Sequence, residues 1–191
     1  RVDRVFKRLL PHTTVFRPDA QNFNWEINVI KSNEVNAFAM PGGKMVIYTG
    51  IIDRLKLSDD EIAAIIGHEM AHVLREHSRE SVSQELLKSS SLSIISSIAG
   101  LGSVGDTLLQ QAGELAFSLP FSRKMETEAD IIGLELMARA GYNPEASVTL
   151  WEKMSSLGGS GASILSTHPA GPDRAAELQR QIPKVAHFYK K

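Results

Sequence analysis

Two histidines and a glutamate within one short segment are the residues of this chain best suited to metal chemistry. His68, Glu69 and His72 form an H-E-x-x-H pattern. On an α-helix, residues four positions apart differ in direction by about 40°, so both imidazoles point the same way, as a tetrahedral zinc ion requires of two neighbouring ligands. Glu69 is displaced by about 100°, which lets its carboxylate reach a water on the metal rather than join the ligands. The pattern predicts a zinc site in which Glu69 acts as general base.

The segment around this pattern is predicted to be helical and buried. Ser58 and Glu61 form a capping box, in which a hydroxyl and a carboxylate satisfy free amides at a helix N-terminus. The predicted helix runs to about Ser78, and the residues just before His68 are almost wholly apolar. A lone H-E-x-x-H pattern also arises by chance on the polar face of a helix. Its position after an apolar run in a capped helix favours the metal site.

A catalytic zinc ion normally has a third protein ligand, and His77 is the nearest candidate along the chain. It follows His68 on the same predicted helix and would lie about 180° around it, facing away. The alternative pattern H-E-x-x-H-x-x-G-x-x-H requires glycine and histidine where this chain has Arg75 and Ser78. The third ligand is therefore expected from another helix.

Acidic residues in a second predicted helix, residues 122–140, supply the candidates. Glu126 and Asp130 are four positions apart and share a face, whereas Glu128 points elsewhere. One of the pair can bind the metal while the other accepts a hydrogen bond from a ligand histidine and orients its ring. Acidic residues on a helix are usually just solvated, so the pairing with H-E-x-x-H is what favours a role at the metal.

The order of predicted elements indicates an α+β fold, mostly helical with a small sheet near the N-terminus. Residues 2–10 have helical spacing, and residues 24–30 alternate as in a half-buried strand. Strands over residues 37–40 and 44–49 are joined by a turn at Pro41-Gly42-Gly43 and form a hairpin. Further helices are predicted over residues 81–98, 106–119, 143–151 and 173–182. No long linker divides the sequence, so residues 1–191 are expected to form a single domain.

The composition fits a globular protein and excludes several classes. Of 191 residues, 42% are hydrophobic and 23% charged, and the net charge of -1 gives no reason to expect nucleic acid as a partner. The absence of cysteine excludes disulfides and thiol nucleophiles. The sequence begins at Arg1 without an initiator methionine, which suggests a trimmed N-terminus. The apolar segment from Leu92 to Val104 is too short to span a bilayer and is expected to be core, a lid, or a contact with a membrane surface or a partner.

Four motifs follow one another along the chain. They are residues 36–43 (NAFAMPGG), the H-E-x-x-H pattern, an E-x-x-A-D motif that begins at Glu126, and Thr167-His168-Pro169 followed by Arg174. This set resembles metallopeptidase family 48, the gluzincin family of HtpX-like and CAAX prenyl protease-like enzymes. The resemblance covers nearly the whole chain and is strongest to soluble, periplasmic-type catalytic domains.

The resemblance implies a zincin-like fold and a role for each motif. It implies Glu126 as the third ligand of one Zn2+ per chain, with Asp130 as its supporting acid. His168 would be a catalytic residue that stabilises the oxyanion or, in a resting form, covers the zinc. Arg174 would pair with an acid near the site. An extended peptide would bind by strand addition to the segment that comprises Asn36, Ala37, Phe38 and Ala39.

The function expected from these residues is zinc-dependent endopeptidase activity on misfolded or membrane-associated proteins, as in protein quality control. The resemblance places the chain in the periplasm or at a membrane. An alternative is a chaperone-like peptide-binding protein whose zinc site is structural or self-inhibited; another is a scaffold with coincidental motifs. Because structural zinc sites are usually closed by four protein ligands, the position of His168 bears on this choice.

Overall fold

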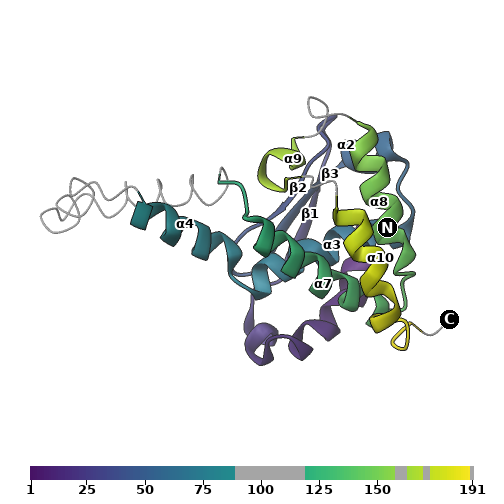
Figure 1. Cartoon of the computed structure of the whole chain (residues 1–191), viewed down its shortest axis with the longest axis horizontal. Coiled ribbons are helices and arrows are strands. Elements are labelled where there is room, and N and C mark those ends of the chain that lie inside the picture. Colours follow the sequence, from purple (N-terminus) through teal and green to yellow (C-terminus); the bar gives the residue numbers. More distant parts are fainter. Residues whose placement is uncertain (89–118, 158–162, 170–172, 190–191) are drawn as a thin grey trace, which may run out of the picture.

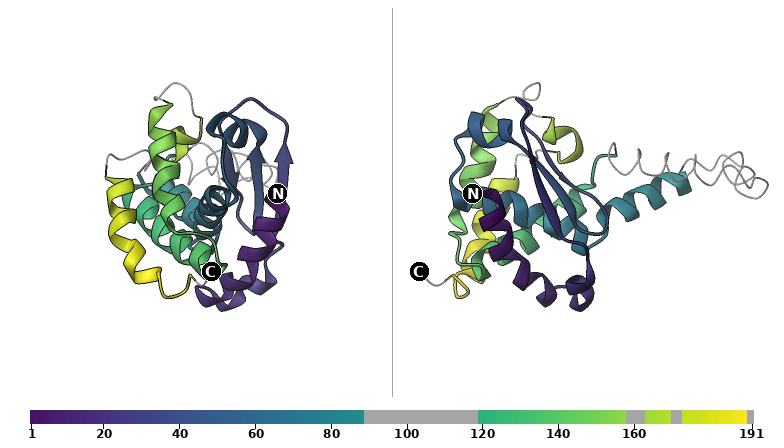
Figure 2. Two further views of the ribbon diagram at one scale, coloured as in Figure 1. Left: turned by 90° about the vertical axis from the view of Figure 1, so that its right-hand side faces the viewer. Right: turned by 180° about the vertical axis from the view of Figure 1, so that it is seen from behind.

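The computed structural model describes residues 1–88, 119–157, 163–169 and 173–189, and every structural statement below concerns these residues. Helix α3 (Asp59–Leu74) lies at the centre, with the sheet on one side and other helices on the opposite side (Figure 1 and Figure 2). It packs against strand β2 (Ala37–Ala39) and helices α1 (Val2–Leu9), α7 (Arg123–Arg139) and α8 (Glu145–Ser156). Every residue from Glu61 to Leu74 is buried, so α3 is the core element that positions its neighbours.

The described residues form a three-stranded sheet in the order β1-β3-β2, with β1 at Glu26–Ile30 and β3 at Lys44–Tyr48. Strands β2 and β3 form the predicted antiparallel hairpin, whereas β1 pairs parallel to β3. Gly42 and Gly43 in the turn have φ values of 89° and 102°, a region open to glycine because it lacks Cβ. The half-buried pattern predicted for β1 is wrong at Val29, which is 49% exposed, because β1 is the edge strand opposite β2.

Helix α3 begins as predicted and ends earlier than predicted. The Ser58 hydroxyl accepts from the Glu61 amide, and the Glu61 carboxylate accepts from the Ser58 amide, which confirms the capping box. The helix was expected to reach about Ser78 but ends at Leu74, because Glu76 adopts a left-handed φ of 55°. Arg17 stabilises this break, since its guanidinium donates to the Leu74 carbonyl and to the Glu76 carboxylate.

The other predicted helices agree in type and differ at their ends. Helix α7 has Ser122 as its N-cap, helix α8 extends beyond the predicted end to Ser156, and α4 (His77–Lys88) starts before the predicted residue 81. Helix α10 (Arg174–Val185) covers the predicted C-terminal helix. Four described elements were not predicted because they are too short to show a clear period. They are the 3₁₀ helices η1 (Leu10–Val15) and η2 (Pro18–Asn22) and the α-helices α2 (Thr49–Leu55) and α9 (Ile164–Thr167).

Some predictions fall outside the described residues. These are the helix over residues 106–119, apart from its last residue, the part of the helix over residues 81–98 that follows residue 88, and the apolar segment from Leu92 to Val104. Among the helices that are described, none combines the length and the apolar character needed to cross a bilayer.

Candidate metal centre

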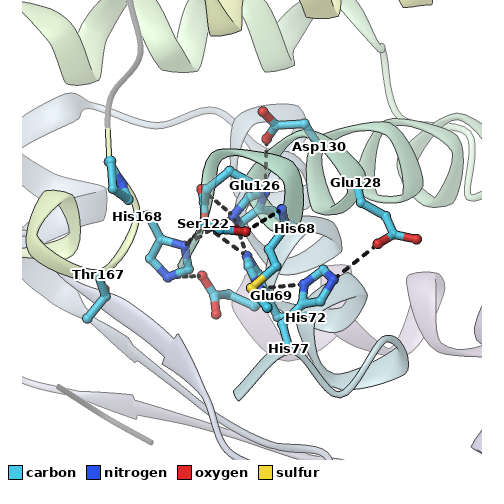
Figure 3. A network of polar contacts seen from close by, with 12 residues as sticks. His68, Glu69, His72, His77, Ser122, Glu126, Glu128, Asp130, Thr167 and His168 are labelled. Carbon is cyan, nitrogen blue, oxygen red and sulfur yellow. Dashed lines mark hydrogen bonds and ion pairs between the residues drawn. The ribbon is translucent and has the colours of Figure 1, made fainter. Parts of the chain in front are cut away.

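Three elements bring the predicted metal ligands together. His68 and His72 project from α3, Glu126 projects from the first turn of α7, and His168 follows α9 (Figure 3). All four side chains are buried, and one ligand atom of each lies within 4.8 Å of the others. The two histidines and the distant carboxylate therefore converge as the sequence predicted.

The spacing of these donors fits a tetrahedral zinc ion. Donors bound at about 2.0–2.1 Å in a tetrahedron are roughly 3.3–3.4 Å from one another. In this structure the two Nε2 atoms of His68 and His72 are 3.0 Å apart. Of the two Glu126 carboxylate oxygens, Oε2 lies 3.4 Å from His68 Nε2 and Oε1 lies 3.3 Å from His72 Nε2. Two imidazoles and a carboxylate are also the ligand types that zinc takes at catalytic sites.

His168 lies at the fourth corner of this arrangement. Its Nδ1 atom is 3.2 Å from His68 Nε2 and 3.0 Å from Glu126 Oε1, distances that match those among the other donors. Its other nitrogen, Nε2, is 3.3 Å from Glu69 Oε1. The structure thus holds His168 in the position that would cover a bound metal ion.

Glu69 lies beside the donors without joining them. Its side chain is buried, its carboxylate accepts from the Ala39 backbone amide, and its Oε1 atom has no aligned hydrogen-bond partner. Burial raises the pKa of the Glu69 carboxyl, an effect that the nearby His168 and His68 partly oppose. A buried carboxylate with a raised pKa, and with an oxygen that makes no aligned hydrogen bond, is suited to accept and return a proton.

Asp130 and Arg174 form the support for the ligands. The buried Arg174 guanidinium donates to both Asp130 oxygens, at 2.8 and 2.6 Å, and to Glu126 Oε2. Its Cζ atom lies over the Trp151 ring, 3.5 Å from the ring centroid. Asp130 Oδ1 is 2.9 Å from His68 Nδ1, although this contact is not aligned as a hydrogen bond. Arg174 thus pairs with acids at the site, as expected, and Asp130 faces the back of a candidate ligand.

The charges at the site favour a cation. Burial alone would lower the pKa of His68, but the carboxylates of Glu126 and Asp130 raise it to about 9. Despite its burial, Glu126 has a lowered pKa because of the histidines around it, and the pKa of His72 is lowered chiefly by burial. The metal-free site therefore carries a proton on His68 between two carboxylates, where a divalent ion would place its charge.

The prediction that His77 faces away from the site is wrong. Because α3 ends at Leu74, the chain turns and returns His77 beneath His72, where it is 1% exposed. His77 Nδ1 is 3.0 Å from His72 Nδ1, and its Nε2 is 3.3 Å from Glu128 Oε2 (Figure 3). Glu128 points away from the four donors, as predicted, yet it contacts the site through His77.

Two aromatic residues at the site were missed in the sequence. Phe121 stacks on the His72 ring with centroids 4.0 Å apart, and Trp151 carries the Arg174 guanidinium. Neither stands in a pattern that predicts a site. The His72 ring stacks on Phe121, and the Arg174 guanidinium carbon lies over Trp151.

A cleft of about 310 Å³ opens beside Glu69 and His168. Asn36, Phe38 and Ala39 from the predicted substrate strand line it, together with Phe121. Ala37 is fully buried and does not line the cleft. The predicted strand therefore lies where a substrate would reach Glu69.

The fold and the site together define a class. An α+β fold with an H-E-x-x-H helix, and a carboxylate from a second helix completing the donors, is that of a zincin-like metallopeptidase. The family model for peptidase family M48 matches residues 1–182, and the chain belongs to this family.

Relatives with known names agree with this family. The chain is 40% identical over 159 residues to the mitochondrial metalloendopeptidase OMA1 of Arabidopsis thaliana, covering 83% of this chain and 32% of that protein. It is 36% identical over 187 residues to the Schizosaccharomyces pombe OMA1, covering 96% of this chain and 53% of that protein. It is 32% identical over 176 residues to the metalloprotease LoiP of Escherichia coli, covering 89% of this chain and 69% of that protein. The chain thus spans about a third to half of the OMA1 proteins it matches here.

Proposed function

We propose that this chain is a zinc metalloendopeptidase in which His68, His72 and Glu126 hold the metal and Glu69 is the general base. The observation that carries this proposal is the close spacing of three donor side chains beside the buried carboxylate of Glu69, whose Oε1 atom makes no aligned hydrogen bond. Residues 1–191 would act as one peptidase domain.

The chain's own residues divide the work of hydrolysis. Bound zinc supplies Lewis-acid activation of water and of the scissile carbonyl. Glu69 takes the proton of the attacking water and returns it to the leaving amine. Asp130 and Arg174 orient the metal ligands. Asp130 faces Nδ1 of His68, and Arg174 donates to Oε2 of Glu126, so each ligand side chain is fixed on the side away from the metal. Because the ligands and their supporting residues are buried, bulk water is excluded and the electrostatic interactions among them are stronger.

The substrate proposed is an extended polypeptide, such as a misfolded or membrane-associated protein. The Asn36 carbonyl and the Met40 amide bond to β3, so with the two-residue period of a strand the main-chain groups of Ala37 and Ala39 point away from β3, at the edge of β2. The Ala39 amide donates to Glu69, so the Ala37 groups and the Ala39 carbonyl are the ones offered to a peptide. Strand addition at this edge would lay a peptide along the cleft beside Glu69. Strand addition requires a substrate with a free backbone, and only unfolded segments offer one. The resemblance to the family is the basis for proposing a periplasmic or membrane-associated location.

His168 decides between this function and a second one. With His168 at the fourth corner, the site has four protein donors, which favours a chaperone-like peptide-binding protein with a closed zinc site. For the peptidase, His168 must leave the corner when substrate enters, and it would then stand ready to stabilise the oxyanion.

Digestion of casein by the zinc-loaded chain, with and without chelator, separates the two functions. For the peptidase we expect hydrolysis that chelator abolishes, and that Glu69→Gln reduces by at least about 100-fold while zinc content stays near one per chain. Glu152→Gln, an exposed change on α8, is the matched control and should cleave as wild type does. Peptide binding without any cleavage by wild type, with zinc bound, would support the closed site instead.

A further inference from the structure

We propose that His77, held by Glu128, is a positioning residue that fixes the tautomer and ring orientation of His72 for metal binding. The inference rests on the proposed metal site and adds a residue pair to it. Two observations carry it. Among the described residues, His77 is the largest buried polar side chain that the proposed hydrolysis does not use, and its Nδ1 atom lies 3.0 Å from Nδ1 of the candidate ligand His72.

The contacts form a line from the surface to the metal donors. Glu128 is partly exposed and bonded to Arg75 at 2.6 Å. Behind it lies His77, with Nε2 toward Glu128 and Nδ1 toward His72. His72 in turn directs Nδ1 toward His77 and Nε2 toward Glu126 and His68.

The positions of the protons follow from this line. His72 can bind a metal through Nε2 only if that atom carries no proton, so the proton of the neutral ring is on Nδ1. His72 Nδ1 then donates, and His77 Nδ1 must accept and carry no proton. The His77 proton is therefore on Nε2, where the Glu128 carboxylate accepts it. Each of the two contacts has one donor and one acceptor only under this assignment.

The two ligand histidines thus have different partners. His68 Nδ1 faces the Asp130 carboxylate directly, whereas a neutral imidazole stands between His72 and the Glu128 carboxylate. The His72 ring is also clamped by Phe121 on one face. Groups of this kind behind a ligand typically change metal affinity by about 10–100-fold.

The local backbone places His77 specifically for this contact. A continuous helix would carry it to the far side of α3, but the left-handed Glu76 turns the chain, and Arg17 donates to the Glu76 carboxylate at 2.9 Å. A left-handed conformation at a residue other than glycine is retained only where surrounding contacts support it.

Zinc affinity of the full chain, measured by competition with a chromogenic chelator, tests the proposal. We expect His77→Leu to raise the zinc dissociation constant by about 10–100-fold, because the His72 Nδ1 proton then loses its buried acceptor. His77→Asn should restore most of the affinity, since its amide oxygen can accept from the same atom. His187→Leu, an exposed histidine on the C-terminal turn, is the control and should bind zinc as wild type does.

A spectroscopic readout distinguishes positioning from packing. In the Co2+-substituted protein, the Nδ1 proton of each ligand histidine gives a shifted, exchangeable NMR signal, and we expect the signal of His72 to exchange faster with water in His77→Leu alone. If His77→Leu does not fold, Glu128→Gln, which keeps an acceptor oxygen, should bind zinc more tightly than Glu128→Ala.

Three results would overturn the inference. The first is an unchanged zinc affinity in His77→Leu, and the second is an equal loss of zinc affinity in His77→Leu and His77→Asn. The third applies if His77→Leu does not fold, and it is an equal zinc affinity of Glu128→Gln and Glu128→Ala. Wild-type protein that binds no zinc would instead refute the proposed function itself, whereas zinc-binding protein without peptidase activity would leave the role of His77 to be judged on affinity alone.

Discussion

Substitution of Gly133 by alanine tests whether the contact between α3 and α7 sets the metal geometry. A Cβ at Gly133 would lie 2.7 Å from the His68 backbone nitrogen and 2.9 Å from the Gly67 carbonyl carbon. Both are backbone atoms, which cannot rotate aside as a side chain can. Ordinary contact begins at 3.4 Å, so α7 must shift away from α3 by about 0.7 Å to accept the methyl group.

We expect Gly133→Ala to lower the stability of the chain, although helix propensity alone would raise it. Alanine is better than glycine in a helix interior by about 1 kcal/mol, so propensity alone predicts a more stable variant. Overpacking costs roughly 1–3 kcal/mol, and a clash of backbone with Cβ belongs at the upper end. The net result is a loss of about 2 kcal/mol, or about 4–8 °C in Tm for a chain of this length.

The same shift should weaken metal binding. Glu126 lies on α7 and His68 on α3, while ligand distances at zinc tolerate only about 0.2 Å. We expect Gly133→Ala to raise the zinc dissociation constant by at least about tenfold, measured by chelator competition beside thermal denaturation of the metal-free chain. Ser83→Ala, on the exposed face of α4, is the control. A Gly133→Ala variant that is more stable than wild type and binds zinc equally well would refute the reasoning.

Four further predictions concern buried charges of the chain. Arg174→Met should lower the free energy of unfolding of the metal-free chain by roughly 3–5 kcal/mol in urea, because Asp130 and Glu126 are left buried without their cation, and a loss below about 1 kcal/mol would contradict this. Zinc binding at pH 7.5 should release a proton, because the pKa of His68 is raised to about 9 in the metal-free chain; calorimetry in two buffers of different ionisation enthalpy measures it, and no buffer dependence would count against it. By the same pKa, His68 stabilises the metal-free chain fully below about 6.5, and this contribution is lost as pH rises through about 9. Lys153→Ala should cost roughly 1–2 kcal/mol at pH 7, because the buried Glu61 loses its 2.7 Å partner. Although burial opposes it, Lys153 and the Ser58 amide lower the pKa of Glu61, so this difference should shrink as pH falls through that lowered pKa; a loss that does not shrink from pH 7 toward acid would exclude the charge as its cause.

The convergence of His68 and His72 could be predicted from sequence because it depends on one helix. Their spacing, the capping box at Ser58 and the apolar run between are all local, and local patterns fix the direction of side chains on a single helix. The same holds for the hairpin, whose glycine turn is marked in the sequence.

The choice between Glu126 and Asp130 could not be made from spacing, because both residues lie on one face of α7. It depends on how far α7 is displaced along α3, and the close approach of Gly67 and Gly133 sets that displacement. In the structure Glu126 faces Nε2 of His68 and Asp130 faces Nδ1 of the same ring. The two carboxylates therefore approach opposite sides of the His68 ring. The position of α7 along α3 decides which of them lies on the metal side.

The error about His77 has a different origin. The sequence from Leu74 to His77 contains no glycine or proline, so nothing marks the end of α3. The break depends on Arg17, which is 59 residues from Glu76 in sequence and donates to its carboxylate. Contacts of this kind appear only once the chain is folded, and they override a local preference for helix.

The position of Arg174 determines how the fourth corner can open. Its guanidinium donates to Glu126, to Asp130 and, at 3.4 Å, to the carbonyl of Pro169, so the segment that carries His168 is tied to the same group that supports the ligands. The His168 amide also donates to the Ile164 carbonyl at 2.9 Å. Displacing this backbone would break contacts to a buried cation, whereas the His168 ring turns about two side-chain bonds that cross none of them. Rotation of the ring would break its own contacts, including those to Glu126 at 3.0 Å and to Glu69 at 3.3 Å, but it would keep the bonds from Arg174 to Glu126 and Asp130. We therefore propose rotation of the ring, rather than movement of the backbone, as the way in which the corner opens.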